Sequence, residues 1–99
     1  MIDLARVVGF DWDEGNAGKN ERHGVSRVEA EGVFFDPRLL VAPDPAHSAV
    51  EPRFHALGET SSRRRLHVTF TLREEGTKIR VVSARTMHRK ERGAYEKQG

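Results

Sequence analysis

Cysteine is absent from this 99-residue chain, so the sequence can build neither a disulfide framework nor a thiolate metal site. A reducing compartment is the simpler expectation for such a chain. No apolar stretch approaches the roughly 20 residues that a membrane-spanning helix needs. The opening segment "MIDLARVVGF" also lacks the basic region followed by a long apolar run that marks a secretory signal. We therefore predict a soluble, cytoplasmic protein that forms one domain over residues 1–99.

Several well-known catalytic spacings are missing as well. The sequence contains no HExxH pattern, no GxSxG pattern and no glycine-rich phosphate loop. Five histidines are present, and none has a metal-ligand spacing to another: His23, His47, His55, His67 and His88. We therefore expect no metal ion and no cofactor.

Charge is unevenly distributed along the chain. Residues 1–60 contain 6 Lys and Arg against 11 Asp and Glu, a balance of −5, whereas residues 61–99 contain 11 against 4, a balance of +7. The second part is the candidate for contact with a polyanion. The alternative is an ordinary solvated charged surface.

Hydrophobic periodicity predicts the first elements. The segment 9–14, "GFDWDE", alternates apolar and acidic residues as a short strand does, and residues 1–8 before it are either extra strand or a loose N-terminal extension. A polar helix follows and stops at Gly24. Ser26 and Glu29 form a capping box that starts a second helix, which Pro37 ends.

From residue 38 onward the apolar residues alternate with polar ones, with the period of two that is typical of strands. Strands are predicted at 38–42, 53–59, 65–73 and 78–85, with a tight hairpin at "EEGT" and a closing helix at 87–97. Together these elements predict an α+β fold in which helices pack on one face of an antiparallel sheet of about four strands.

The opposite sheet face is expected to be open and polar. His67, Thr69 and Thr71 would point to it, joined either by Arg80 or by Ser83 and Arg85, because a one-residue slip of the strand exchanges the two sets. The sequence does not fix that register.

The polar residues around this face suit RNA cleavage without a metal. Such a reaction uses the 2′-hydroxyl of the substrate as nucleophile, so the protein supplies proton transfer and cations for the phosphorane. Histidine titrates near neutral pH, and arginine offers a planar fork that matches phosphate oxygens. Each residue also has a structural alternative, as a solvated arginine, a structural histidine or a packing tyrosine.

The order of motifs over residues 10–97 resembles the BrnT family of RelE-like toxins. The resemblance rests on "FDWD…N…RHGVS", "EAEGVFFDP", "DPAHS", "RFHALGET" and "FTLR…IRVVSARTMHRKERGAYE". It implies a small RelE-like fold and a ribonuclease toxin of a type II toxin-antitoxin pair that halts translation. It also implies inhibition by a BrnA-like antitoxin of the ribbon-helix-helix kind, in a heteromeric complex that binds its own operator DNA through the antitoxin.

The matching positions give the predicted site. His23 is the first candidate for proton transfer, Arg80 and Arg85 neutralise the phosphate, and Glu91 and Tyr95 complete the catalytic set, with Tyr95 either stacking on a base or packing its helix. The expected RNA-binding residues are Arg65, Arg89, Lys90 and Arg92.

The chain departs from its relatives in one helix. They usually carry a lysine at the position of Asn16 and a Lys-His pair at the position of Arg22 and His23. These departures concern a proton-transfer role for a lysine in this helix and do not affect the arginine roles. The alternative function is a binding module that grips nucleic acid or an acidic partner with the same face and does not cleave it.

Overall fold

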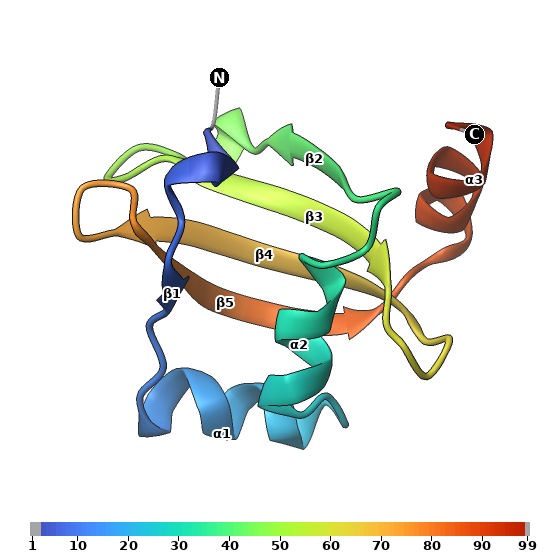
Figure 1. Ribbon diagram of the computed structural model, residues 1–99, viewed down its shortest axis with the longest axis horizontal. Helices are drawn as coiled ribbons and strands as arrows, with labels where there is room; N and C mark the ends of the chain where they lie inside the picture. Colours follow the sequence, from blue (N-terminus) through green and yellow to red (C-terminus); the bar gives the residue numbers. More distant parts are fainter. Residues whose placement is uncertain (1–2, 99) are drawn as a thin grey trace.

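The computed structural model describes residues 3–98 and consists of a five-stranded sheet with helices on both of its faces (Figure 1). The strand order is β1-β5-β4-β3-β2. β2 to β5 pair antiparallel, whereas β1 pairs parallel with β5, so the sheet is mixed. The elements are η1 Leu4–Arg6, β1 Gly9–Phe10, α1 Glu14–Arg22, α2 Arg27–Val33, β2 Leu40–Pro43, η2 Pro45–His47, β3 Arg53–Glu59, β4 Arg65–Arg73, β5 Lys78–Thr86 and α3 Arg89–Lys97. The α+β prediction is confirmed.

Side-chain caps fix where the first two helices begin. Asp13 accepts a hydrogen bond from the backbone N–H of Asn16, and Ser26 accepts one from Glu29, so both helices open with a capping box. Gly24 lies at φ +77° between them, a conformation that costs glycine little. The first strand is shorter than predicted because Asp13 already belongs to the cap of α1.

The N-terminal segment lies against the sheet. Leu4 and Val7 pack beside the main core, and the N–H of Val8 donates to the carbonyl of Thr77 at 2.8 Å. The first two residues of the expected 1–8 extension lie outside the described residues. Within residues 3–98, every helix is too short or too polar to cross a membrane.

The main core fills the space between the sheet and the layer of α1 and α2. Leu66, Val68 and Phe70 of β4 are fully buried in it, as their alternation predicts. The ring of Phe34 meets Phe70 edge-to-face with centroids 5.0 Å apart. Burial of one such side chain stabilises the fold by about 1.5–3 kcal/mol.

The opposite face is partly covered by α3, so the prediction that all helices pack on one face is wrong. Leu57 of β3 pairs with His67 and lies on this face, where it forms a second cluster with Met87 and Tyr95. These apolar side chains hold α3 over one end of the sheet (Figure 1). On the same face His67, Thr69 and Thr71 are only 7%, 7% and 2% exposed rather than open to solvent, and the hydroxyl of Thr71 donates to the carbonyl of Pro52.

A β-bulge in β5 resolves the register that the sequence left open. Thr69 pairs with Ser83 and Phe70 pairs with Val81, so Val82 between them has no partner. The extra residue resets the alternation, and Arg85 opposite His67 lies on the same face as Arg80 opposite Thr71. The two alternatives predicted from the sequence, Arg80 on the one hand and Ser83 with Arg85 on the other, therefore both occur, because the bulge places all three residues on one face.

Gly58 of β3 allows α2 to approach the sheet. A Cβ at this position would lie 2.8 Å from the Cγ1 of Val33 and 2.8 Å from its carbonyl oxygen. We expect Gly58→Ala to lower the free energy of unfolding by about 1–3 kcal/mol, because the backbone of α2 must move. Chemical denaturation measures this loss, with Gly18→Ala as the control because a Cβ there meets nothing within 4 Å. Equal stability of the two variants would contradict the close packing of α2 on β3.

Candidate functional site

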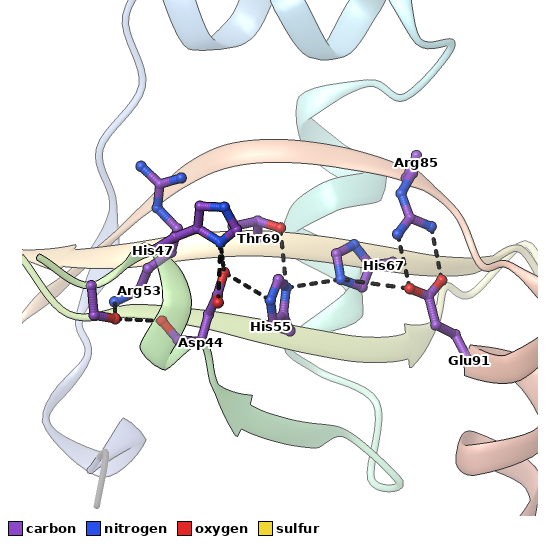
Figure 2. Close-up of polar contacts among 9 residues, drawn as sticks. Asp44, His47, Arg53, His55, His67, Thr69, Arg85 and Glu91 are labelled. Carbon is purple, nitrogen blue, oxygen red and sulfur yellow. Dashed lines mark hydrogen bonds and ion pairs between the residues drawn. The ribbon is translucent and has the colours of Figure 1, made fainter.

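A pocket of about 330 Å³ lies on the face that α3 partly covers. Its lining combines apolar side chains of β2 and β3 with four polar ones from β3, β4, β5 and α3: Leu40, Ala42, His55, Leu57, His67, Arg85 and Glu91. Figure 2 shows that the polar side chains form one continuous line across the sheet, from Asp44 to Arg85.

Arg85 and Glu91 form a two-pronged ion pair at one end of this line. Nη1 and Nη2 of Arg85 each donate to one carboxylate oxygen of Glu91 at 2.8 Å (Figure 2). Glu91 also accepts a hydrogen bond from the backbone N–H of His88 at 2.7 Å, as part of the capping box of α3. The same carboxylate therefore caps α3 and holds Arg85. The hydrogen bonds from Arg85 lower the pKa of Glu91 to about 2 against the opposing effect of burial. Glu91 is therefore an anion at neutral pH.

Arg85 keeps donors for a second anion. Its guanidinium carries five N–H groups, and three of them are used by Glu91 and by the carbonyl of Thr86. The two that remain are on Nε and Nη2, which form the side edge of the planar fork. A phosphate can therefore bind side-on while Glu91 holds the other edge.

His67 lies next to this pair and stays neutral at pH 7. Burial lowers its pKa to about 4, and the nearby charge of Glu91 only partly offsets the burial. Its Nε2 lies 2.9 Å from Nδ1 of His55 and 3.9 Å from Oε2 of Glu91. Its Nδ1 is buried and has no hydrogen-bond partner among the described residues.

His55 connects this histidine to a carboxylate. Its Nε2 lies 3.0 Å from Oδ2 of Asp44, and its Nδ1 lies 3.3 Å from the hydroxyl of Thr69. Asp44 is 8% exposed and also contacts Nδ1 of His47 at 3.0 Å. Burial raises the pKa of Asp44, but the hydrogen bond and charge of His47 and the charge of His55 outweigh it, and the net shift is downward. Asp44, His55 and His67 were not among the predicted site residues.

Tyr95 of α3 and Arg65 of β4 lie beside the pocket. Tyr95 is 2% exposed, its hydroxyl donates to Asp36, and its ring lies between the guanidinium groups of Arg38 at 4.9 Å and Arg65 at 5.5 Å. Burial and the carboxylate of Asp36 raise the pKa of Tyr95 to about 12. Arg65 also donates to Glu59 at 3.2 Å and to Glu96. This environment favours the packing role of Tyr95 over base stacking, which needs an uncovered ring.

Arg80 and His23 lie outside the pocket lining. Arg80 donates to Asp13 at 2.7 Å and lies 3.5 Å from Asp11, so it ties β5 to the start of α1. His23 is exposed at the C-terminal cap of α1. The structure therefore brings together only Arg85 and Glu91 of the predicted catalytic set.

The predicted RNA-binding residues of α3 face solvent. Arg89, Lys90 and Arg92 are all exposed near the start of the helix. Arg92 donates to the carbonyl of Met87 at 3.1 Å. The positive charge of the C-terminal part is thus available beside the end of the pocket that Arg85 occupies.

Comparison with known families identifies the chain. A family model described as "Ribonuclease toxin, BrnT, of type II toxin-antitoxin system" matches residues 12–91. The chain belongs to the BrnT family. The match confirms the resemblance seen in the motifs, and it indicates a ribonuclease toxin whose system supplies an antitoxin partner and whose substrate is RNA. The matched range of this BrnT chain includes every residue of the polar line from Asp44 to Glu91, whereas Arg92 and Tyr95 fall beyond it.

No curated protein matched the chain.

Proposed function

We propose that this BrnT chain is an endoribonuclease that needs no metal ion and uses the 2′-hydroxyl of its substrate as nucleophile. The observation that carries the proposal is the juxtaposition, in one pocket, of a guanidinium edge with free donors and a pair of histidines in contact with each other. Among residues 3–98 no group of three histidine, aspartate or glutamate side chains is placed to hold a metal ion.

The arrangement suits the two demands of the reaction. Arg85 binds a non-bridging phosphate oxygen with its free side edge and stabilises the charge that develops on the phosphorane. The pair His55 and His67 takes the proton of the 2′-hydroxyl, because a neutral imidazole is a competent base near pH 7. Glu91 holds Arg85 in place and, with a pKa of about 2, is a weak base.

The remaining predicted residues keep proposed roles around this centre. Arg89, Lys90 and Arg92 hold the RNA backbone as it leaves the pocket, since phosphate contacts position the strand. Arg65, Arg80 and Tyr95 support the fold around the site through the contacts described above. His23 remains a prediction for proton transfer, to be compared directly with the histidine pair.

We propose further that cleavage halts translation in the cytoplasm and that a BrnA-like antitoxin of the ribbon-helix-helix kind silences the toxin. The antitoxin would carry acidic side chains to the exposed cations of α3 and, in the complex, bind operator DNA. The family description supports an antitoxin partner.

One observation favours the alternative of a binding module. The cations Arg65, Arg80 and Arg85 are each paired with a carboxylate of the same chain, which reduces the charge available to a transition state. A protein that only grips RNA would tolerate this neutralisation better than an enzyme would.

Product analysis of a defined RNA distinguishes the two functions. In the presence of a chelator we expect cleavage that leaves a 2′,3′-cyclic phosphate, and no cleavage of a matched strand with one 2′-methoxy group at the cut site. Cutting of the 2′-methoxy strand would exclude the proposed nucleophile. Loss of all cutting in chelator would exclude metal independence, and binding without cleavage of either strand would establish the binding module.

A further inference from the structure

The polar line across the sheet contains three groups in series that share protons. Asp44, His55 and His67 are joined by contacts of 3.0 Å and 2.9 Å (Figure 2). Each contact needs one hydrogen, and each imidazole has a choice of nitrogen for its proton. The positions of these hydrogens follow from the two ends of the series.

The buried end is His67. Its Nδ1 has no partner among the described residues, and in folded proteins an unpaired buried N–H is rarer than an unpaired buried acceptor. The proton of neutral His67 is therefore on Nε2, which points to Nδ1 of His55 at 2.9 Å. His55 must accept this hydrogen bond on Nδ1.

The other end is a carboxylate. Asp44 can only accept, so Nε2 of His55 at 3.0 Å must carry a hydrogen. Both ends thus demand the same arrangement of His55: a proton on Nε2 and a lone pair on Nδ1.

We infer, building on the proposed function, that His55 is the general base of the reaction and that Asp44 is the residue that positions it. His55 lines the pocket, and 35% of its side chain is exposed, whereas His67 is 7% exposed. Asp44 holds the ring and compensates the positive charge that His55 acquires, as a carboxylate does behind a catalytic histidine. His67 keeps Nδ1 of His55 unprotonated until the substrate arrives.

In the proposed step His55 removes a proton from the substrate, and one phosphorus–oxygen bond replaces another. The 2′-hydroxyl donates its proton to Nδ1 of His55, and the Nε2–H of His67 turns to Oε2 of Glu91, 3.9 Å away in the free protein. The 2′-oxygen forms a bond to phosphorus, and the bond from phosphorus to the 5′-oxygen breaks. The departing 5′-oxygen takes a proton from water, and His55 later returns its proton to solvent.

The tautomer is measured without RNA. Two-bond nitrogen–hydrogen correlation spectra of the free wild-type protein, labelled with ¹⁵N, report which nitrogen of His55 is protonated. We expect Nε2–H in the wild type and a mixture of both tautomers in Asp44→Asn. The opposite tautomer in the wild type would overturn the inference.

Cleavage kinetics give a second test of the roles of His55 and Asp44. Asp44→Asn is expected to reduce kcat by about 10²-fold and to leave KM unchanged, because the base is affected and the binding cations are not. The matched control is His47→Gln, which also removes a partner of Asp44 but from an exposed side chain, and it should leave both the tautomer and kcat at the wild-type values. Full activity of Asp44→Asn overturns the inference, as does an equal loss in His47→Gln.

The two proposals fail in different ways. If wild-type protein cleaves RNA and Arg85→Ala does not, while Asp44→Asn remains fully active, only the role of His55 and Asp44 is overturned. If the wild type does not cleave RNA, the proposed function is overturned and the catalytic role of His55 with it.

Discussion

Arg85→Ala is expected to reduce kcat for RNA cleavage by about 10²–10³-fold, equivalent to about 2.7–4 kcal/mol of barrier. The reason is that Arg85 presents the only guanidinium edge in the pocket lining, with free donors on Nε and Nη2. Arg85→Lys should restore only part of the activity, because an ammonium group keeps the charge but lacks the planar fork.

Single-turnover kinetics beside thermal melting separates catalysis from folding in this test. The matched control is Arg73→Ala, which also removes an arginine from a pair with a glutamate, Glu51 at 2.9 Å, but at the far end of β4. We expect Arg73→Ala to cleave RNA at the wild-type rate. Activity of Arg85→Ala at the wild-type level, or a parallel fall of activity and melting temperature, would show that Arg85 has no catalytic role.

The second large effect is a loss of stability in mild acid that depends on His67. Its pKa is lowered from 6.5 to about 4 in the folded protein, so between these values the unfolded chain binds more protons than the folded one. The free energy of unfolding therefore falls as the pH falls through this window, by about 2 kcal/mol between pH 7 and pH 5 and by about 3 kcal/mol in total.

Urea unfolding at several pH values measures this dependence. His67→Gln should remove the decrease between pH 6.5 and pH 4.5, whereas the exposed control His23→Gln should keep it. Glu91 acts in a lower window, because its pKa is depressed to about 2 and its contribution is lost only below its ordinary value of 4.5. A wild-type protein whose stability stays constant from pH 7 to pH 4.5 would contradict the buried, neutral state of His67.

Local patterns in the sequence predicted most of the elements. The strands at 53–59 and 65–73 occur at their predicted bounds, because alternating apolar residues end at a polar loop in each case. Ser26 starts α2 as its capping box predicts. These features depend on neighbours along the chain, and so a single sequence contains them.

Features that depend on register were not predictable in the same way. Two adjacent valines, Val81 and Val82, interrupt the alternation in this strand, but such a pair does not by itself identify a bulge. Without the bulge, Arg80 and Arg85 could not be assigned to one face. The position of α3 likewise depends on Leu57, whose partners Met87 and Tyr95 are distant in sequence.

The histidine pair was missed for a related reason. His55 and His67 lie on two predicted strands whose pairing the sequence did not assign, and in the structure His55 pairs with Thr69, and His67 pairs with Leu57. The two rings are therefore diagonal neighbours. Their contact can be predicted only if the register of β3 against β4 is known, and that register depends on the length of the loop between the strands. The shared outward direction of both histidines was the one signal that could have suggested the pair.

The parallel pairing of β1 with β5 also constrains how the protein is made. Asp13 bonds to Arg80 across 67 residues, and Asn16 bonds to the carbonyl of Val81 across 65. A ribosome delivers the N-terminal segment first, so β1 and α1 emerge long before the strand that they contact. The growing chain cannot complete the sheet until β5 has been synthesised, and Arg85 of that strand and Glu91 come later still. A nascent chain that has not yet presented β5 and α3 therefore has no assembled pocket.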